Sequence, residues 1–96
     1  MASVLEGHAL LNYTHPLDLS RRTILIEKIL PPGEDPIITL TVIAGDYNNF
    51  REINEALESS IRGEGKEKIR WWYLPLFLQD AENLANSILS LIRKGE

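Results

Sequence analysis

The chain has 96 residues, of which 44% are hydrophobic and 25% charged, and it contains no cysteine. These values are typical of one soluble globular domain spanning residues 1–96, and they exclude disulfide bonds, thiolate metal sites and a cysteine nucleophile. The net charge of −4 gives no basic excess for duplex nucleic acid. No apolar run reaches the roughly 20 residues of a membrane span, and the N-terminus lacks the basic region of a secretory signal. We therefore expect a cytoplasmic protein that binds neither membranes nor duplex nucleic acid, and whose small size favours a homodimer. The abundance of Ile, Leu, Glu, Lys and Arg is typical of a thermophile.

The N-terminal part of the chain holds one clear strand and one ambiguous segment. Residues 3–13 are predicted to form a strand that ends near Asn12. Residues 17–36 fit two structures equally well. The β-branched run TILIEKIL favours a strand that pairs with the next one across the turn PPGED. A helix is the alternative, because Pro16 is tolerated in a first helical turn and the two prolines after Leu30 would end it.

The middle of the chain predicts a strand and a helix. Residues 36–45 are β-branched and continuously apolar, as in a strand covered on both faces. The helix that follows is expected to be capped by Asn49, with Glu52 completing the capping box. Gly63 stands where a C-terminal cap belongs. Four apolar residues fall on one face of this helix: Phe50, Ile53, Leu57 and Ile61.

The C-terminal third repeats the order of strand and helix. A strand is predicted over residues 68–74 and ends at Pro75, because proline cannot donate to a central ladder. Trp71 and Trp72 point to opposite faces of it, one toward a core and one toward an interface. Asp80 is predicted to cap the last helix. The apolar stripe of that helix consists of Leu84, Ala85, Ile88, Leu89 and Ile92.

Two fold classes follow from the ambiguous segment. A helical segment gives an α/β domain of order βαβαβα with a mainly parallel sheet. A strand gives an α+β fold with a hairpin formed by residues of about 22–30 and 36–44. We take the α/β fold as the prediction. In such a fold the carboxyl ends of the strands meet at one edge of the sheet, where ligands bind.

Three loops at these predicted strand ends carry hydrogen-bonding and aromatic groups, over residues 12–16, 45–49 and 75–80. Each precedes a possible helix N-terminus, which attracts phosphate, and aromatic rings beside amide groups suit nucleobases. Two arginines lie close behind the first loop. The candidate ligand-binding residues are Asn12, Tyr13, Thr14, Arg21, Arg22, Asp46 and Asn49.

Each candidate also has a structural interpretation. His15 can shape the turn before Pro16, and Asn12 can bond the loop backbone. Asp46 and Asn49 can cap the following helix. Sequence alone leaves both interpretations open.

Standard catalytic motifs are absent: the sequence has no Walker loop, nucleophile elbow, His-Glu-x-x-His motif or dinucleotide fingerprint. His8 and His15 have no matching carboxylates, so neither a metal nor another cofactor is expected. His15 is the one candidate catalytic residue. As a general acid or base it would serve metal-independent phosphodiester cleavage, in which a ribose 2′-hydroxyl attacks the adjacent phosphorus.

The stretch LLNYTHPLDL, residues 10–19, resembles a motif of small CRISPR-associated accessory proteins of the Csx type from type III systems. Their motif reads Leu-Asn-aromatic-Ser/Thr-His-Pro-Leu, and a later strand ends near an aspartate that Asp46 resembles. The resemblance implies a Rossmann-like homodimer that binds a cyclic oligoadenylate, expected to be cyclic tetra-adenylate, at its interface. It implies that Asn12, Thr14 and His15 line that site, and that the protein sequesters the messenger or cleaves it as a ring nuclease.

A second hypothesis needs no ligand. The Trp-rich stretch IRWWYLPLFL, residues 69–78, would form a protein interface of a non-catalytic interaction or assembly subunit. His15 would then only shape a turn.

Overall fold

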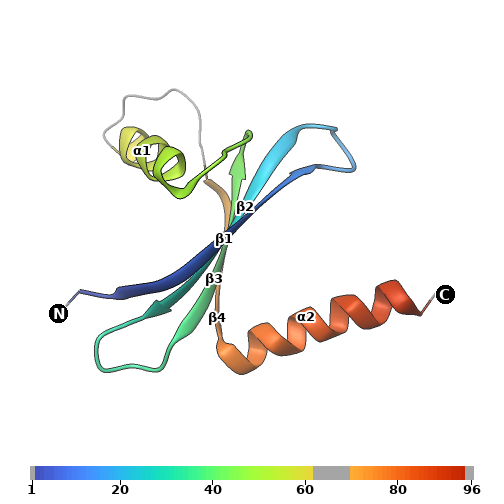
Figure 1. Ribbon diagram of the computed structural model, residues 1–96. Helices are drawn as coiled ribbons and strands as arrows, with labels where there is room; N and C mark the ends of the chain where they lie inside the picture. Colours follow the sequence, from blue (N-terminus) through green and yellow to red (C-terminus); the bar gives the residue numbers. More distant parts are fainter. Residues whose placement is uncertain (1, 62–69, 95–96) are drawn as a thin grey trace.

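The computed structural model describes residues 2–61 and 70–94, which form four strands and two helices (Figure 1). In chain order they are β1 (Val4–Thr14), β2 (Arg21–Leu30), β3 (Ile37–Ala44), α1 (Phe50–Ile61), β4 (Arg70–Phe77) and α2 (Leu78–Arg93). The strands form one sheet in the order β1-β2-β3-β4, and each neighbouring pair is antiparallel. The fold is therefore α+β.

The predicted α/β domain with a parallel, Rossmann-like βαβαβα sheet is wrong, and the α+β alternative is confirmed. The ambiguous segment forms β2, whose β-branched residues pair with β3 from Arg22 opposite Ala44 to Ile29 opposite Ile37. Gly33, with φ of 71°, supplies the left-handed backbone of the connecting turn. Because successive strands run in opposite directions, their carboxyl ends alternate between the two ends of the sheet, top and bottom along the strand direction.

Helix α1 packs on one side of the sheet, which we call the covered face (Figure 1). Its Ile53 is fully buried together with Leu25 of β2 and Ile43 of β3. The half-buried residues around this small core are Leu10, Tyr47, Phe50 and Leu57. The predicted apolar face of the helix is thus confirmed as far as its side chains are described.

The N-terminus of α1 is capped as the sequence predicts. The Glu52 amide donates to Asn49 Oδ1 at 2.9 Å, and Glu52 Oε2 accepts a bond from the Asn48 amide at 3.0 Å. These bonds satisfy amide groups that the helix itself leaves without a partner. The predicted cap at Gly63 and the strand residues 68–69 lie outside the described residues.

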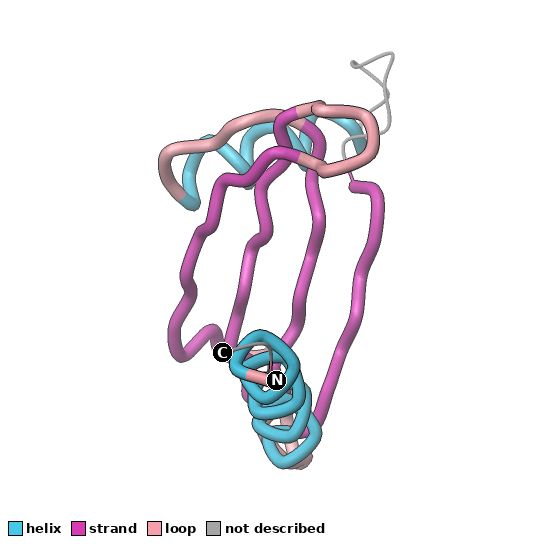
Figure 2. Tube along the Cα trace, turned by 90° about the vertical axis from the view of Figure 1, so that its right-hand side faces the viewer, coloured by secondary structure: helices cyan, strands magenta, loops and turns pink. Residues whose placement is uncertain are grey.

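The opposite side of the sheet, which we call the open face, carries a layer of apolar side chains. Figures 1 and 2 show α1 and α2 on opposite sides and at opposite ends of the sheet, with α2 projecting away from it. No residue of α2 is buried, so its predicted apolar stripe does not pack into a core of this chain. By strand register, the open face is formed by Ile24, Ile26, Ile38, Leu40, Val42, Trp72, Leu74 and Leu76.

Two predictions for the C-terminal elements are wrong. Pro75 does not end β4 but lies within it, opposite Thr39, because β4 is an edge strand that tolerates a missing donor. Asp80 does not cap α2, which begins at Leu78 with Phe77 as an N-cap that makes no side-chain bond. Asp80 instead occupies the first turn, where a carboxylate favours the helix dipole.

Candidate functional site

The predicted site residues cluster at one end of the sheet, where the β1–β2 turn and the β3–α1 loop lie together. Antiparallel pairing brings the end of β1, the start of β2 and the end of β3 to this end of the sheet. Residues 75–80, predicted as the third loop, instead form the last part of β4 and the first turn of α2 at the opposite end of the sheet, so the expected meeting of all three loops is wrong. We call the first grouping the turn cluster. Its members are Asn12, Thr14, His15, Asp18, Ser20, Arg21, Arg22, Thr23 and Asp46.

Arg21 joins both segments of the turn cluster. Its Nε lies 3.2 Å from each carboxylate oxygen of Asp46, and its Nη1 donates to Thr14 Oγ1 at 2.8 Å. Both charged side chains are about half exposed, at 50% and 48%. A surface ion pair of this kind contributes between about 0 and 1 kcal/mol. Three predicted ligand-binding residues thus bond one another.

Asn12 belongs to a second network, centred on Thr23. The Thr23 hydroxyl lies 2.6 Å from Asn12 Oδ1 and 2.8 Å from the Gly45 carbonyl, and it accepts the Tyr47 amide at 3.2 Å. One hydroxyl proton serves only one of the two oxygens. Asn12 Oδ1 also accepts the Tyr47 amide at 3.5 Å, so the Asn12 side chain bonds the loop directly. Asn12 therefore secures the loop backbone, as its structural interpretation predicts.

His15 makes bonds that shape the β1–β2 turn. Its Nδ1 accepts the amides of Leu17 at 3.2 Å and Asp18 at 3.4 Å. The same Nδ1 lies 3.4 Å from Asp18 Oδ1. This geometry fits the structural interpretation of His15.

Asp18 closes the same turn through both carboxylate oxygens. Its Oδ1 accepts from the Ser20 hydroxyl at 2.7 Å and the Ser20 amide at 2.9 Å, and its Oδ2 accepts from Arg22 Nη2 at 2.8 Å. The bonds from Ser20, with a smaller effect of the Arg22 charge, lower the pKa of the Asp18 carboxyl from 3.8 to about 2. Arg22 is thus held within the turn cluster.

The lowered pKa of Asp18 predicts how the turn responds to acid. Because the folded-state pKa lies below the unfolded value, the bonds of Asp18 stabilise the fold fully above pH 3.8, and this stabilisation is lost as the pH falls through about 2. An NMR titration should place the carboxyl midpoint of Asp18 near 2. Ser20→Ala should move it toward 3.8, whereas a wild-type midpoint near 3.8 would contradict this account.

The turn also contains backbone strain that can be relieved. Leu19 is 74% exposed and has φ of 60°, a left-handed conformation that costs a residue with a Cβ roughly 1–2 kcal/mol. Leu19→Gly should therefore raise the free energy of unfolding by about 1 kcal/mol in urea denaturation. The matched control is Leu17→Gly, since Leu17 is 89% exposed and has no positive φ. An equal effect of both changes would show that strain is not the cause.

The remaining predicted ligand-binding residues, Asn49 and Tyr13, lie outside the turn cluster. Asn49 caps α1. Tyr13 is half-buried on the open-face side of β1, opposite Arg22 in the register.

Among the described residues, no three His, Asp or Glu side chains are arranged to hold a metal ion. Neither described helix has the length and apolar character to cross a membrane.

No protein-family model, curated protein or solved structure matches this chain. The resemblance of residues 10–19 to CRISPR-associated proteins therefore has only that motif behind it, and the Rossmann-like fold that it implied is wrong.

Sequence reasoning missed Thr23, Asp18 and Ser20. Thr23 directly precedes the apolar residues 24–26 of β2, and its signal is a hydroxyl at the start of that aliphatic run. Asp18 and Ser20 have the spacing of a local turn in which a carboxylate bonds an amide two residues on. The polar groups of the turn cluster are mostly directed at one another, which is typical of a structural cluster.

Proposed function

We propose that the protein is a non-catalytic assembly subunit of the cytoplasm, which associates with another protein chain through the open face and α2. The observation that carries this proposal is that α2 has an amphipathic sequence and yet no buried residue. A helix with one apolar stripe is stabilised mainly by packing that stripe against a partner. The described chain supplies no such packing along most of α2.

Exposed apolar side chains are present both on the open face and along α2. Singly exposed apolar residues are normal, but contiguous patches mark interaction sites. On the open face, Trp72 is 48% exposed, which agrees with the hypothesis that one tryptophan of β4 lies at an interface. The large apolar residues of α2 that are at least 36% exposed are Leu78, Leu84, Ile88, Leu89, Leu91 and Ile92.

The turn cluster gives the competing function less support. Arg21 bonds both Asp46 and Thr14, and Asn12 bonds Thr23. A phosphate ligand would have to replace the Asp46 carboxylate at Arg21. Two of the polar groups that the messenger hypothesis needs, Asn12 and Arg21, therefore already have protein partners.

Sedimentation equilibrium of the full chain, with binding of a dye that fluoresces on apolar surfaces, tests the proposal. We expect a mass above that of one chain, with dye binding that falls as assembly proceeds, because the apolar surface becomes covered. A mass of one chain without dye binding would contradict the proposal, because α2 would then have closed onto its own sheet.

Binding of a cyclic oligoadenylate stays a prediction with its own test. Radiolabelled cyclic tetra-adenylate is mixed with the protein and run on a native gel, then on a denaturing gel over time. Retardation without a linear product would indicate sequestration, and a linear product that His15→Ala abolishes would indicate a ring nuclease. No retardation at micromolar protein would end the messenger hypothesis.

A further inference from the structure

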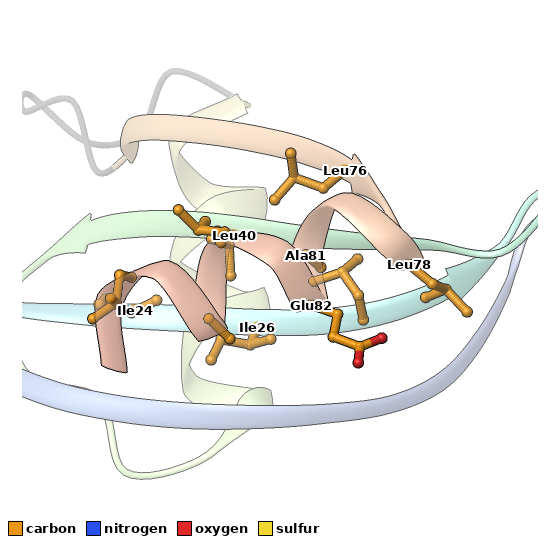
Figure 3. Close-up of a pocket in the computed structure, with 11 residues that line it drawn as sticks. Ile24, Ile26, Leu40, Leu76, Leu78, Ala81 and Glu82 are labelled. Atoms are coloured by element: carbon orange, nitrogen blue, oxygen red, sulfur yellow. The ribbon is translucent and has the colours of Figure 1, made fainter. Parts of the chain in front are cut away.

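A cleft separates α2 from the open face (Figure 3). Its volume is about 550 Å³, and Glu82 is the only charged residue among the described residues that line it. In Figure 3 Ile24, Ile26 and Leu40 lie on the strands toward the helix, and Ala81 lies on the helix toward the strands. The helix begins directly after β4, with no connecting residue between Phe77 and Leu78. It therefore leaves the sheet at an angle, and of its residues only Ala81 is as much as half-buried.

The chain exposes more surface than a compact monomer of its size. Its accessible surface is 7149 Å², whereas a folded monomer of 10.9 kDa exposes about 5,600 Å². The radius of gyration is 15.1 Å, against about 12.5 Å for a compact domain of this length. A standard protein interface buries about 800 Å² of each partner, so an excess of about 1,500 Å² on one chain corresponds to the larger interface of an obligate homodimer. A second copy of the chain seated in the cleft would cover surface of this extent.

The charges of α2 indicate what that second chain is. Residues 83–92 contain no charged side chain, and the polar positions among them are Asn or Ser. Charged residues are depleted in the same way from the core of protein interfaces. The helix has two acidic residues at its start, Asp80 and Glu82, and two basic residues at its end, Arg93 and Lys94. Such a helix is complementary to a second copy of itself that runs in the opposite direction.

We propose that two copies of the chain associate about a two-fold axis, with their α2 helices antiparallel and each helix entering the cleft of its partner. This inference rests on the proposed assembly function and names the partner. In the antiparallel pair, the acidic start of one helix lies beside the basic end of the other, and the opposed helix dipoles attract. The apolar stripe of each helix, with Ile88 near its centre, faces its own cleft and therefore contacts the partner helix that enters it.

Charge reversal tests this arrangement. Asp80→Lys with Glu82→Lys makes both ends of α2 basic, and Arg93→Glu with Lys94→Glu makes both ends acidic. Each variant alone should have a dissociation constant raised about tenfold or more, because both end contacts of the dimer become repulsive. An equimolar mixture of the two variants should recover wild-type affinity as a heterodimer, which native mass spectrometry identifies.

The matched control reverses an ion pair on α1, on the other side of the sheet. Arg51 and Glu55 pair at 3.2 Å and are 88% and 65% exposed, so Arg51→Glu with Glu55→Lys should leave the dimer unchanged. Circular dichroism of each variant checks that it folds. Ile88→Glu should abolish the dimer, because Ile88 lies at the centre of the proposed contact.

The outcomes separate this inference from the proposed function. If the wild type assembles but the mixture binds no better than either variant alone, the antiparallel pairing of α2 is wrong while the assembly function stands. If the wild type is a monomer that binds no apolar dye, both are wrong. Recovery in the mixture with loss in Ile88→Glu supports both.

Discussion

Replacing Ile53 with alanine is expected to lower the free energy of unfolding by about 3 kcal/mol. Ile53 is fully buried, and only Leu25 and Ile43 join it as buried apolar residues among those that the structure describes. Its removal leaves a cavity between α1 and the sheet that neighbouring side chains fill only partly. Domains of this size have only about 5–15 kcal/mol of stability, so the loss is a large part of the total.

Urea denaturation at one fixed protein concentration measures this loss, because assembly also contributes to apparent stability. Leu17→Ala is the control. It removes the same kind of apolar group from a side chain that is 89% exposed, and it should change stability by less than about 0.5 kcal/mol. Similar losses for both variants would show that α1 does not hold the core.

Local signals in the sequence predicted the part of the fold that depends on local chemistry. The capping pair of Asn49 and Glu52, three residues apart, marked the start of α1. The helical spacing of Phe50, Ile53 and Leu57 marked the face that packs on the sheet. These features depend on neighbours within one or two turns, so a single sequence is enough to reveal them.

The sequence alone does not show which distant segments pair as strands. The run from Thr23 to Leu30 has a β-branched composition as well as helix-compatible spacing, and only its register with β3 decides between them. An end of β4 at Pro75 is expected only for a central strand, and β4 lies at the edge of the sheet, where proline is tolerated. Helix α2 starts without a side-chain cap, so the cap-forming residue type of Asp80 does not mark its start.

The sequence predicted the position of the candidate site residues better than it predicted their role. Asn12, Thr14, Arg21 and Asp46 do gather at one end of the sheet. Their residue types, however, are equally suited to binding a ligand and to binding one another. Only distances distinguish the two, and the distances show the residues bonded to one another.

A sheet with one face covered and one face open links stability to assembly. Among the described residues, the covered face has a core of three buried apolar side chains, and the layer on the open face is only half-buried. In the proposed dimer this layer would be buried further by the second chain. The apparent stability of such a dimer should therefore rise with protein concentration.

Replacing Thr23 with valine is expected to lower the free energy of unfolding by about 2 kcal/mol. The side chain is fully buried, and valine has nearly the same shape, so packing is kept. The hydroxyl, however, links Asn12, the Gly45 carbonyl and the Tyr47 amide at the edge of the turn cluster. Without it the Gly45 carbonyl and the Tyr47 amide, both on half-buried residues, lose a bond, and the cost is that of leaving partly buried polar groups unsatisfied.

The chain offers a matched control for this change in Thr39, which is also fully buried in the sheet. Its Oγ1 has no hydrogen-bond partner among the residues that the structure describes. Thr39→Val should therefore leave stability unchanged or raise it, because it removes a buried polar group that forms no bond. The two variants differ only in whether the lost hydroxyl was bonded, so urea denaturation of both isolates the contribution of the Thr23 network. Equal effects would mean that this network does not stabilise the junction of β1, β2 and the β3–α1 loop.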